Sequence, residues 1–399
     1  MTCLNVYMDN AATTKMSPAA QKAMTYAMAE LWGNPSSLHS EGQKAAEALA
    51  DARRRVAACL GARPEEIYFT SGGSEADNWA LRSAAGLGAR KDKKHIISTA
   101  FEHHAVLHTL DALSKEGFSV TLLDVGQEGL VSPEQVEKAI RPDTCLVSVM
   151  YANNEIGTVQ PIEAIGKICR ERGVLFHTDA VQAAGHLPID VQAQCIDLLS
   201  LSGHKFGGPK GVGVLYAKKG IRLQNLIFGG PQERGRRAGT ENLPGIYSMA
   251  AALEESCGSM KEDTAHTRAL RDRLIRGLSE IPHAVLNGSP DRRLPGNVSF
   301  CFEGIEGESL LLLLDDKGIR ASSGSACTSG SLDPSHVLLA IGRPHEIAHG
   351  SLRLTLSRNT TAEEVDYAIS AIREVVGYLR SISPVWRDLE AGKGKFITK

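Results

Sequence analysis

Between residues 67 and 217, short apolar runs alternate with helical stretches, and this alternation restricts the fold more than any other feature of the sequence. The runs are rich in Val, Ile and Leu and end at polar residues, as buried strands do. They lie at 67–70, 95–98, 120–124, 146–150, 174–178, 197–201 and 212–217. Helical segments separate most of them, which predicts an α/β fold with a mainly parallel, doubly wound sheet of seven strands. The last run follows its predecessor closely, so a hairpin and one antiparallel strand are expected there.

The pattern changes on either side of this block, which predicts a second, smaller domain. The chain has 399 residues, enough for two cores. We expect a large domain at 15–258 and a small α+β domain formed by 1–14 and 259–399. The tail from residue 390, EAGKGKFITK, is polar and rich in Gly and Lys, and is predicted to be disordered.

Composition excludes several classes of function. The net charge of −2 provides no strong field, so neither nucleic acid nor anionic lipid is an expected partner. No apolar run approaches the ~18 residues of a membrane span, and the first residues have no signal-peptide pattern. The eight cysteines form no CxxC pair, which argues against a structural zinc site and a disulfide framework. A reduced, cytoplasmic protein is expected.

Polar residues follow two neighbouring strand candidates where each one ends. Asp179 ends the run at 174–178, and Ser202, Gly203, His204 and Lys205 follow the run at 197–201. Ligands of parallel sheets bind at this edge. A lysine and an acid there suit pyridoxal phosphate, because the amine forms a Schiff base and the acid partners the pyridinium nitrogen. A solvated salt bridge is the alternative, but the Gly- and Ser-rich surroundings of Lys205 leave backbone N–H groups free for a phosphate.

The segment TSGGSEADN (70–78) follows a strand candidate and opens a helix. Gly73 permits a close backbone approach, and Ser74 places a hydroxyl at the helix N-terminus, where a phosphate is favoured. An ordinary serine cap is the alternative.

Cys327 lies in SSGSACTSGS, where every neighbour is small or polar. Such a stretch packs poorly, so we expect it to be exposed and mobile. An exposed thiol close to a cationic site is a candidate nucleophile, since the thiolate is the reactive form. A loop cysteine without function is the alternative.

Four long segments together resemble the cysteine desulfurases, pyridoxal-phosphate enzymes of fold type I and aminotransferase class V. They are HTDAVQ (177–182), SLSGHKFGGPKGVGVLY (200–216), QERGRRAGTEN (232–242) and ASSGSACTSGSLDPSHV (321–337). The resemblance extends from YMDNAATT (7–14) to SLRLTLSRNTT (351–361) and is strongest to the nitrogen-fixation type, NifS. It implies removal of sulfur from L-cysteine, giving L-alanine and a persulfide on Cys327.

The resemblance also assigns roles around the cofactor. His103 is expected to stack on the pyridine ring and to move protons, and His104 to be structural. Asn154 and Gln182 are expected beside the phenolic oxygen, although spacing alone does not separate Asn154 from its neighbour Asn153. Ser74 departs mildly from the family, which usually has Thr there. The counterpart of Thr240 reaches the phosphate of the other subunit, which implies a homodimer with shared sites.

Arg353 resembles the residue that clamps the substrate carboxylate, with Asn34 as a weaker second contact and Arg358 as the alternative clamp. The implied acceptor of the sulfur is an iron–sulfur scaffold protein of the NifU kind, and Cys327 would meet iron only transiently, through its persulfide at hand-off. Two other functions compete: a selenocysteine lyase or other β-lyase, and a non-catalytic protein that keeps the fold. The long Cys327 loop favours the persulfide-forming class over the lyases, and the four intact residues Lys205, Asp179, His103 and Cys327 argue against lost activity.

Overall fold

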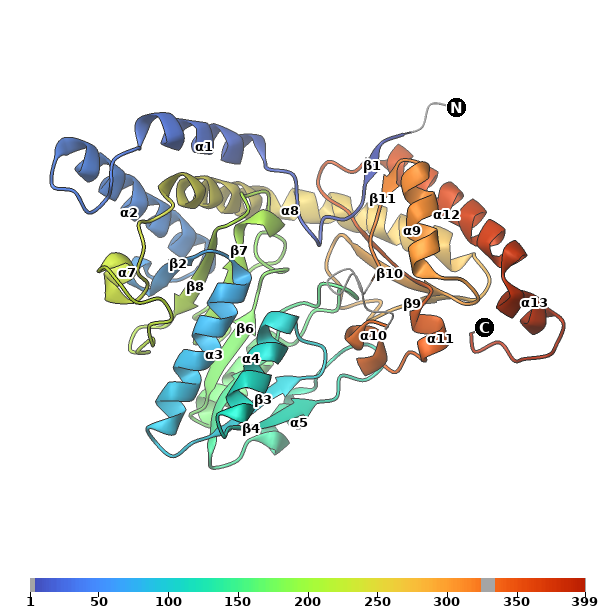
Figure 1. Cartoon of the computed structure of the whole chain (residues 1–399), viewed down its shortest axis with the longest axis horizontal. Coiled ribbons are helices and arrows are strands. Elements are labelled where there is room, and N and C mark those ends of the chain that lie inside the picture. The colour runs from blue at the N-terminus through green and yellow to red at the C-terminus, as the bar shows by residue number, and fades with distance from the viewer. Residues whose placement is uncertain (1–3, 324–333, 399) are drawn as a thin grey trace.

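A seven-stranded sheet forms the centre of the larger of two lobes (Figure 1). In spatial order its strands are β2 (Ile67–Thr70), β8 (Gly213–Ala217), β7 (Leu198–Ser202), β6 (Leu175–Asp179), β5 (Thr144–Ser148), β3 (His95–Thr99) and β4 (Ser119–Leu123). β8 runs antiparallel to both of its neighbours, and every other pairing is parallel. The predicted parallel sheet with one antiparallel strand is therefore confirmed. The structure is a computed structural model that describes residues 4–323 and 334–398.

Helices cover both faces of this sheet, because successive strand side chains point to opposite sides. On one face Ile96, Leu146 and Leu198 pack with α3 (Gly73–Ala89) and α4 (His104–Lys115). On the other face Ile97 and Phe176 belong to a cluster that includes residues of several helices. Among them are α2 (Ser40–Leu60), α5 (Pro133–Ala139), α6 (Ile162–Glu171) and the first half of α8 (Leu243–Ser279). The sheet is doubly wound, as predicted.

Local capping signals set several helix ends. Ser17 caps α1 (Pro18–Glu30) by accepting from the N–H of Ala20. Gly61 ends α2 with a φ of 65°, a left-handed conformation that favours glycine. Thr361 and Glu364 form the expected reciprocal cap of α12 (Ala362–Ile382).

The smaller lobe is built on α8 and on two small sheets (Figure 1). Its elements are β1 (Val6–Tyr7), β9 (Ala284–Leu286), β10 (Asn297–Phe302), α9 (Gly307–Asp316), β11 (Ile319–Arg320), α10 (His336–Ala340), α11 (His345–Ala348), β12 (Ser351–Thr355), α12 and α13 (Pro384–Glu390). β12, β10 and β9 pair antiparallel, and β1 of the N-terminal arm pairs with β11. The remaining short elements are η1 (Pro64–Glu66), η2 (Gly203–Lys205) and α7 (Gln232–Gly235).

The division into 15–258 and 1–14 with 259–399 stays a prediction, because α8 runs unbroken through residue 258. No helix in the described ranges is long and apolar enough to cross a membrane.

The end of the tail after α13 contacts the small lobe, so the prediction of disorder from residue 390 was wrong for residues 396–398. The ring of Phe396 stacks on His283 with 3.9 Å between centroids. The N–H groups of Ile397 and Thr398 donate to the carboxylate of Glu303 at 2.8 and 3.0 Å. One aromatic ring and one buried acid hold a segment whose composition alone indicates no structure.

Candidate active site

The ends of β6 and β7 bring three predicted site residues to one edge of the large sheet. Asp179 is the last residue of β6, Ser202 is the last residue of β7, and Lys205 follows in η2. The Lys205 amine donates to the carbonyl oxygens of Ala11 and Ala12 at 2.7 and 2.8 Å. The amide of Gln182 donates to Ala11 O at 3.0 Å. The N-terminal arm therefore crosses the site directly against the lysine.

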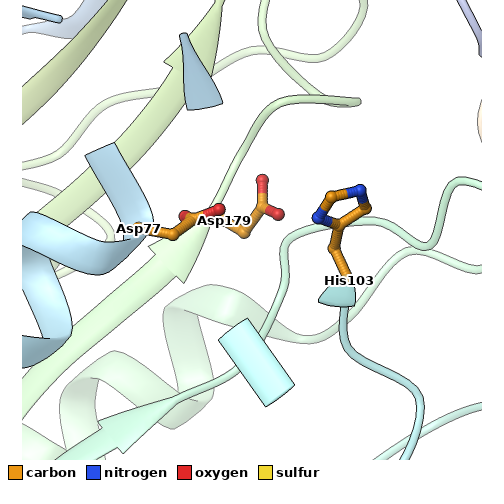
Figure 2. A group of neighbouring side chains, drawn as sticks. All are labelled: Asp77, His103 and Asp179. Carbon is orange, nitrogen blue, oxygen red and sulfur yellow. The ribbon is translucent and has the colours of Figure 1, made fainter. Parts of the chain in front are cut away.

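Asp179 lies between a second buried acid and a histidine. Figure 2 shows its carboxyl between Asp77 and His103, and one oxygen of each aspartate and a ring nitrogen of His103 all lie within 4.8 Å of one another. Asp179 also accepts from the N–H of Val181 at 2.9 Å. Burial raises the pKa of Asp179, while His103 and Lys205 oppose that rise.

His103 stands at the start of α4 and caps it. Its Nδ1 accepts from the N–H of Ala105 at 3.1 Å, so in the neutral ring the proton is on Nε2. The neighbouring His104 packs instead against His336 and His108, with ring centroids 4.6 and 5.0 Å apart.

The N-terminus of α3 is pressed against the sheet beside Ser202. A Cβ on Gly73 would lie 2.7 Å from Val181 Cγ2, and a Cβ on Gly72 would lie 3.7 Å from Ser202 Oγ. Glycine is needed at residue 73 for this approach. Ser74 follows on the exposed side of the first turn. The helix N-terminus, with its free N–H groups, and the Ser202 hydroxyl together form an anion-binding corner.

His204 precedes Lys205 in η2, and its ring faces the N-terminal arm. Its Nδ1 lies 3.2 Å from Thr13 Oγ1, and burial together with the Lys205 charge lowers the pKa of His204 to about 4. Gly203 precedes it and is packed so closely that a Cβ there would lie 3.0 Å from Met249 Cγ. The loop that carries Lys205 is thus held on both sides.

The structure separates Asn154 from Asn153. The Asn153 amide donates to Phe101 O at 3.0 Å and accepts from the N–H groups of Glu155 and Ile156, so its side chain stabilises the turn. The Asn154 side chain makes no hydrogen bond with residues 4–323 or 334–398. The backbone carbonyl oxygen of Asn154 accepts from Arg353. Asn154 is the asparagine available to a ligand.

Arg353 reaches the site from β12 and is buried. Its Nη2 donates to Asp9 at 2.9 Å and its Nη1 to Asn154 O at 3.3 Å, while its Nε has no hydrogen-bond acceptor in the described chain. Arg358 is bound elsewhere. It contacts Ser256 at 3.2 Å and Asp263 at 3.6 Å, both on α8. Arg353 contacts Asp9 and the Asn154 carbonyl, whereas Arg358 contacts α8, and the choice of Arg353 as the clamp stays a prediction.

Within one chain, Asn34 and Thr240 do not join the other predicted residues. Asn34 is exposed in the connection between α1 and α2, and its side chain accepts from the N–H of Ser36 at 2.9 Å. Thr240 is exposed between α7 and α8. The α1–α2 connection and α7 lie toward the left end of the large lobe in Figure 1, away from the small lobe.

Cys327 lies outside the described residues, but the two flanks of its segment meet the site. Ser322 exchanges backbone hydrogen bonds with Arg353, at 3.2 and 2.6 Å. On the other flank the Ser335 hydroxyl donates to the carboxylate of Glu155, and His336 Nε2 lies 2.9 Å from Glu102 O. The described flanks, Ser322 on one side and Ser335 with His336 on the other, therefore lie beside Arg353 and beside the neighbours in sequence of Asn154 and His103.

Sequence reasoning missed three buried acids around the site: Asp77, Glu102 and Glu155. Burial raises the pKa of Glu102 to about 8 and that of Glu155 to about 7, and it raises the pKa of Asp77 as well. A signal for Asp77 was present, because helical spacing from Gly73 through Ala76 to Ala80 places it on the apolar face of α3.

The residues present suit pyridoxal phosphate. The edge offers one buried carboxyl for a ring nitrogen, one lysine amine for the aldehyde carbon, and the anion-binding corner of α3 for the phosphate. Arg353 adds a buried Nε–H without an acceptor among the described residues, as a group that binds a substrate carboxylate would.

The aminotransferase class V family model matches residues 6–368. A protein of Methanosarcina thermophila named cysteine desulfurase IscS is 55% identical over 381 residues, which cover 95% of this chain and 94% of that protein. The protein of the same name from Clostridium botulinum is 54% identical over 391 residues, covering 97% and 98%. A solved structure described as a NifS-like protein superposes with a TM-score of 0.89 at 40% identity, over 94% of this chain and 100% of that one.

Proposed function

Because this chain belongs to the aminotransferase class V family and is a cysteine desulfurase, we propose that it stores the sulfur of L-cysteine as a persulfide on Cys327. The reaction balances: cysteine and the Cys327 thiol give alanine and a Cys327 persulfide. The enzyme depends on pyridoxal phosphate and has the fold of type I enzymes. When bound, this cofactor supplies an electron sink for bonds broken at the substrate α-carbon.

The large-lobe residues have distinct tasks in this proposal. Asp179 holds the proton of the ring nitrogen, and the α3 N-terminus with Gly73, Ser74, Ser202, Gly203 and His204 holds the phosphate. The Lys205 amine is kept at the site by two carbonyl oxygens and removes the α-proton. His103 presents Nε2–H as a second proton carrier. Gln182 and Asn154 orient the ring from its phenolic side.

The small-lobe residues select the substrate. Arg353 binds the carboxylate of cysteine through its open Nε and its fork, and Asn34 is a weaker second contact. The single observation that carries the proposal is that one flank of the Cys327 segment is hydrogen-bonded to Arg353 and the other to Glu155 and Glu102, which adjoin Asn154 and His103 in the sequence.

The test is Cys327→Ala with Cys327→Ser beside it. Both variants should bind cofactor and change its absorption on adding cysteine, because the residues of the cofactor site are intact. Both should form almost no alanine, because no thiolate receives the sulfur. Alanine formation with persulfide on another residue would refute the nucleophile assignment, and release of free sulfide with pyruvate would indicate a β-lyase.

We also propose a homodimer in which Thr240 completes the phosphate site of the other subunit. Thr240 is exposed and makes no hydrogen bond with the described residues. Large apolar side chains are exposed on the same lobe, with Trp32 at 69%, Leu38 at 92% and Phe228 at 82%. A second copy covering them accounts for this exposure.

Mixing Thr240→Ala with Lys205→Ala protein should restore part of the activity, through heterodimers with one intact site. No recovery, or an active monomer, would contradict the shared site.

The sulfur is proposed to pass to an iron–sulfur scaffold in the cytoplasm, with iron reaching Cys327 only at hand-off. The narrower proposal is a NifU-type scaffold and nitrogenase maturation, supported by the resemblance of 187–192, 232–242 and 381–386 to NifS. Ile382 and Val385 in the last segment are exposed, at 54% and 63%, and available to a partner. General cluster supply is the second candidate, favoured by the higher identity of the relatives named IscS.

Competition distinguishes these two acceptors. Enzyme loaded with labelled cysteine sulfur is offered NifU-type and housekeeping scaffolds together. Faster transfer to the NifU-type scaffold supports the nitrogenase proposal. Equal transfer, or preference for the housekeeping scaffold, refutes it and leaves cysteine desulfuration intact.

A further inference from the structure

Asp77 is a carboxyl group buried without compensation. It lies on the sheet-facing side of α3 with no measurable exposure, and neither carboxyl oxygen has a hydrogen-bond partner in the described chain. An ionised carboxylate in this position would lose its hydration without replacement, which is among the most costly arrangements in a protein interior.

The histidine that faces Asp77 from β6 does not supply it with a positive charge. His177 Nε2 lies 3.6 Å from Asp77 Oδ1. However, the His177 ring is shared between the hydroxyls of Ser148 at 2.8 Å and Ser200 at 3.1 Å, and burial lowers the pKa of His177 to about 3. Burial therefore favours the neutral ring of His177.

On the other side Asp179 and His103 each have an atom within 4.8 Å of Asp77, and the surroundings of Asp179 differ from those of Asp77. His103 faces Asp179 (Figure 2). Burial raises the pKa of Asp179, and His103, the N–H of Val181 and Lys205 each oppose that rise. Asp77 has only the Ser200 hydroxyl to favour its charged form among the causes of its pKa shift. Burial first, and then the charge of Asp179, raise the pKa of Asp77, with a smaller rise from Glu102 and an opposing effect of the Ser200 hydroxyl. When two close acids share one proton, it resides on the acid with the less favourable surroundings for charge.

We propose that Asp77 carries a proton at neutral pH and thereby leaves Asp179 as the single negative charge at this end of the sheet. If Asp77 were ionised, its negative charge within 4.8 Å would raise the pKa of Asp179, and Asp179 would then keep the proton. Asp77 acts through Asp179 and is a positioning residue. The proton assignment stands on the geometry alone, and its consequence for the ring nitrogen rests on the proposed function.

Infrared spectroscopy of the holoenzyme tests the assignment directly. A protonated carboxyl has a C=O stretching band that a carboxylate lacks, and the band shifts in D2O. Protein grown with aspartate labelled at the side-chain carbon separates this band from those of Glu102 and Glu155. We expect a labelled aspartate band at pH 7 that disappears in Asp77→Asn. In the control Glu102→Gln that band should remain.

A second measurement follows the same proton through unfolding. The pKa of Asp77 is raised in the native state. The stabilisation that Asp77 contributes to the free energy of unfolding is therefore complete below the unfolded pKa of about 3.9, and it is lost as the pH rises toward the native pKa. Unfolding of wild type at neutral pH should thus release about one proton more than unfolding of Asp77→Asn. Absence of an aspartate band in wild type, its persistence in Asp77→Asn, or equal proton release would overturn the proposal. If Asp77→Asn does not fold, Asp77→Ser and the labelled wild type still give the decisive spectra. Loss of desulfurase activity leaves these readings unaffected.

Discussion

The two sides of the active site are built from different kinds of structure. On the large-lobe side, Asp179, Ser202 and Lys205 project from the ends of two adjacent strands, and they lie within 27 residues of one another in sequence. On the small-lobe side, Arg353 donates to Asp9 and to the backbone carbonyl of Asn154. These three residues come from three distant parts of the chain. The first side is fixed by a sheet, and the second depends on how the lobes and the arm come together.

This difference separates two tasks electrostatically. The large-lobe side contains buried acids and histidines, and burial shifts their pKa values. Because the fold fixes these groups, they need not reorganise during the reaction. The small-lobe side contains one ion pair, Arg353 with Asp9, in which Asp9 remains 23% exposed. A substrate carboxylate can join or replace Asp9 on the guanidinium, so this side can respond to the ligand.

Lys205→Ala tests the fixed side and should have the largest effect. Removing the proton carrier should lower the rate of alanine formation by about 10³-fold or more. It should also abolish covalent attachment of the cofactor after borohydride reduction, as followed by peptide mass spectrometry. Lys210→Ala is the control and should keep the adduct. An adduct mapped to Lys210 in wild type would place the reacting amine elsewhere and remove the strand-end argument.

Arg353→Lys tests the responsive side. The variant keeps the charge and loses the fork, so the loss of a hydrogen bond to a charged group, about 1.5–3 kcal/mol, should raise KM for cysteine roughly 10- to 100-fold. The turnover number should change less, because the groups of the large-lobe side are untouched. Arg358→Lys is the matched control, since Arg358 is bound to α8. A raised KM in Arg358→Lys with an unchanged KM in Arg353→Lys would identify Arg358 as the residue that binds the substrate carboxylate.

The large-lobe side could be predicted from sequence, and the reason is physical. Strands end where apolar residues stop, so Asp179 and Lys205 could be placed on one edge without knowing the rest of the fold. Gly73 could be placed at a helix start for the same reason. The mainly parallel sheet followed from the same alternation of strands and helices.

The small-lobe side could not be predicted in this way. The ion pair of Arg353 with Asp9 joins residues 344 positions apart. The contact of Ser335 with Glu155 likewise crosses from one lobe to the other. Such pairs leave no periodic signal in a single sequence. The choice of Asn154 over Asn153 also depended on which side chain the turn uses, and adjacent residues of one type cannot show that.

Ser335→Ala tests how the two sides are connected. Ser335 caps α10 through the N–H groups of Val337 and Leu338 and donates to Glu155. Its loss should cost about 1 kcal/mol of unfolding free energy and slow sulfur transfer to Cys327. The absorption change on binding cysteine should stay as in wild type. Ser132→Ala is the matched control, because Ser132 caps α5 away from the site and should show the stability loss alone. Equal rates in both variants would mean that this flank does not matter for transfer.

Phe396→Ala should have the smallest effect and tests whether the small lobe's stability can be changed without its chemistry. The ring stacks on His283 and lies 5.2 Å from Trp386 between centroids, so the variant loses an aromatic cluster at the edge of the lobe. We expect a loss of about 0.5–1.5 kcal/mol in unfolding free energy, measured by urea denaturation of the holoenzyme, with KM and turnover as in wild type. Ile397→Ser is the control, since that side chain is 53% exposed and should change neither quantity. A raised KM in Phe396→Ala would show that packing of the tail reaches Arg353. The substrate side would then depend on the whole lobe, well beyond the three segments that meet at the guanidinium.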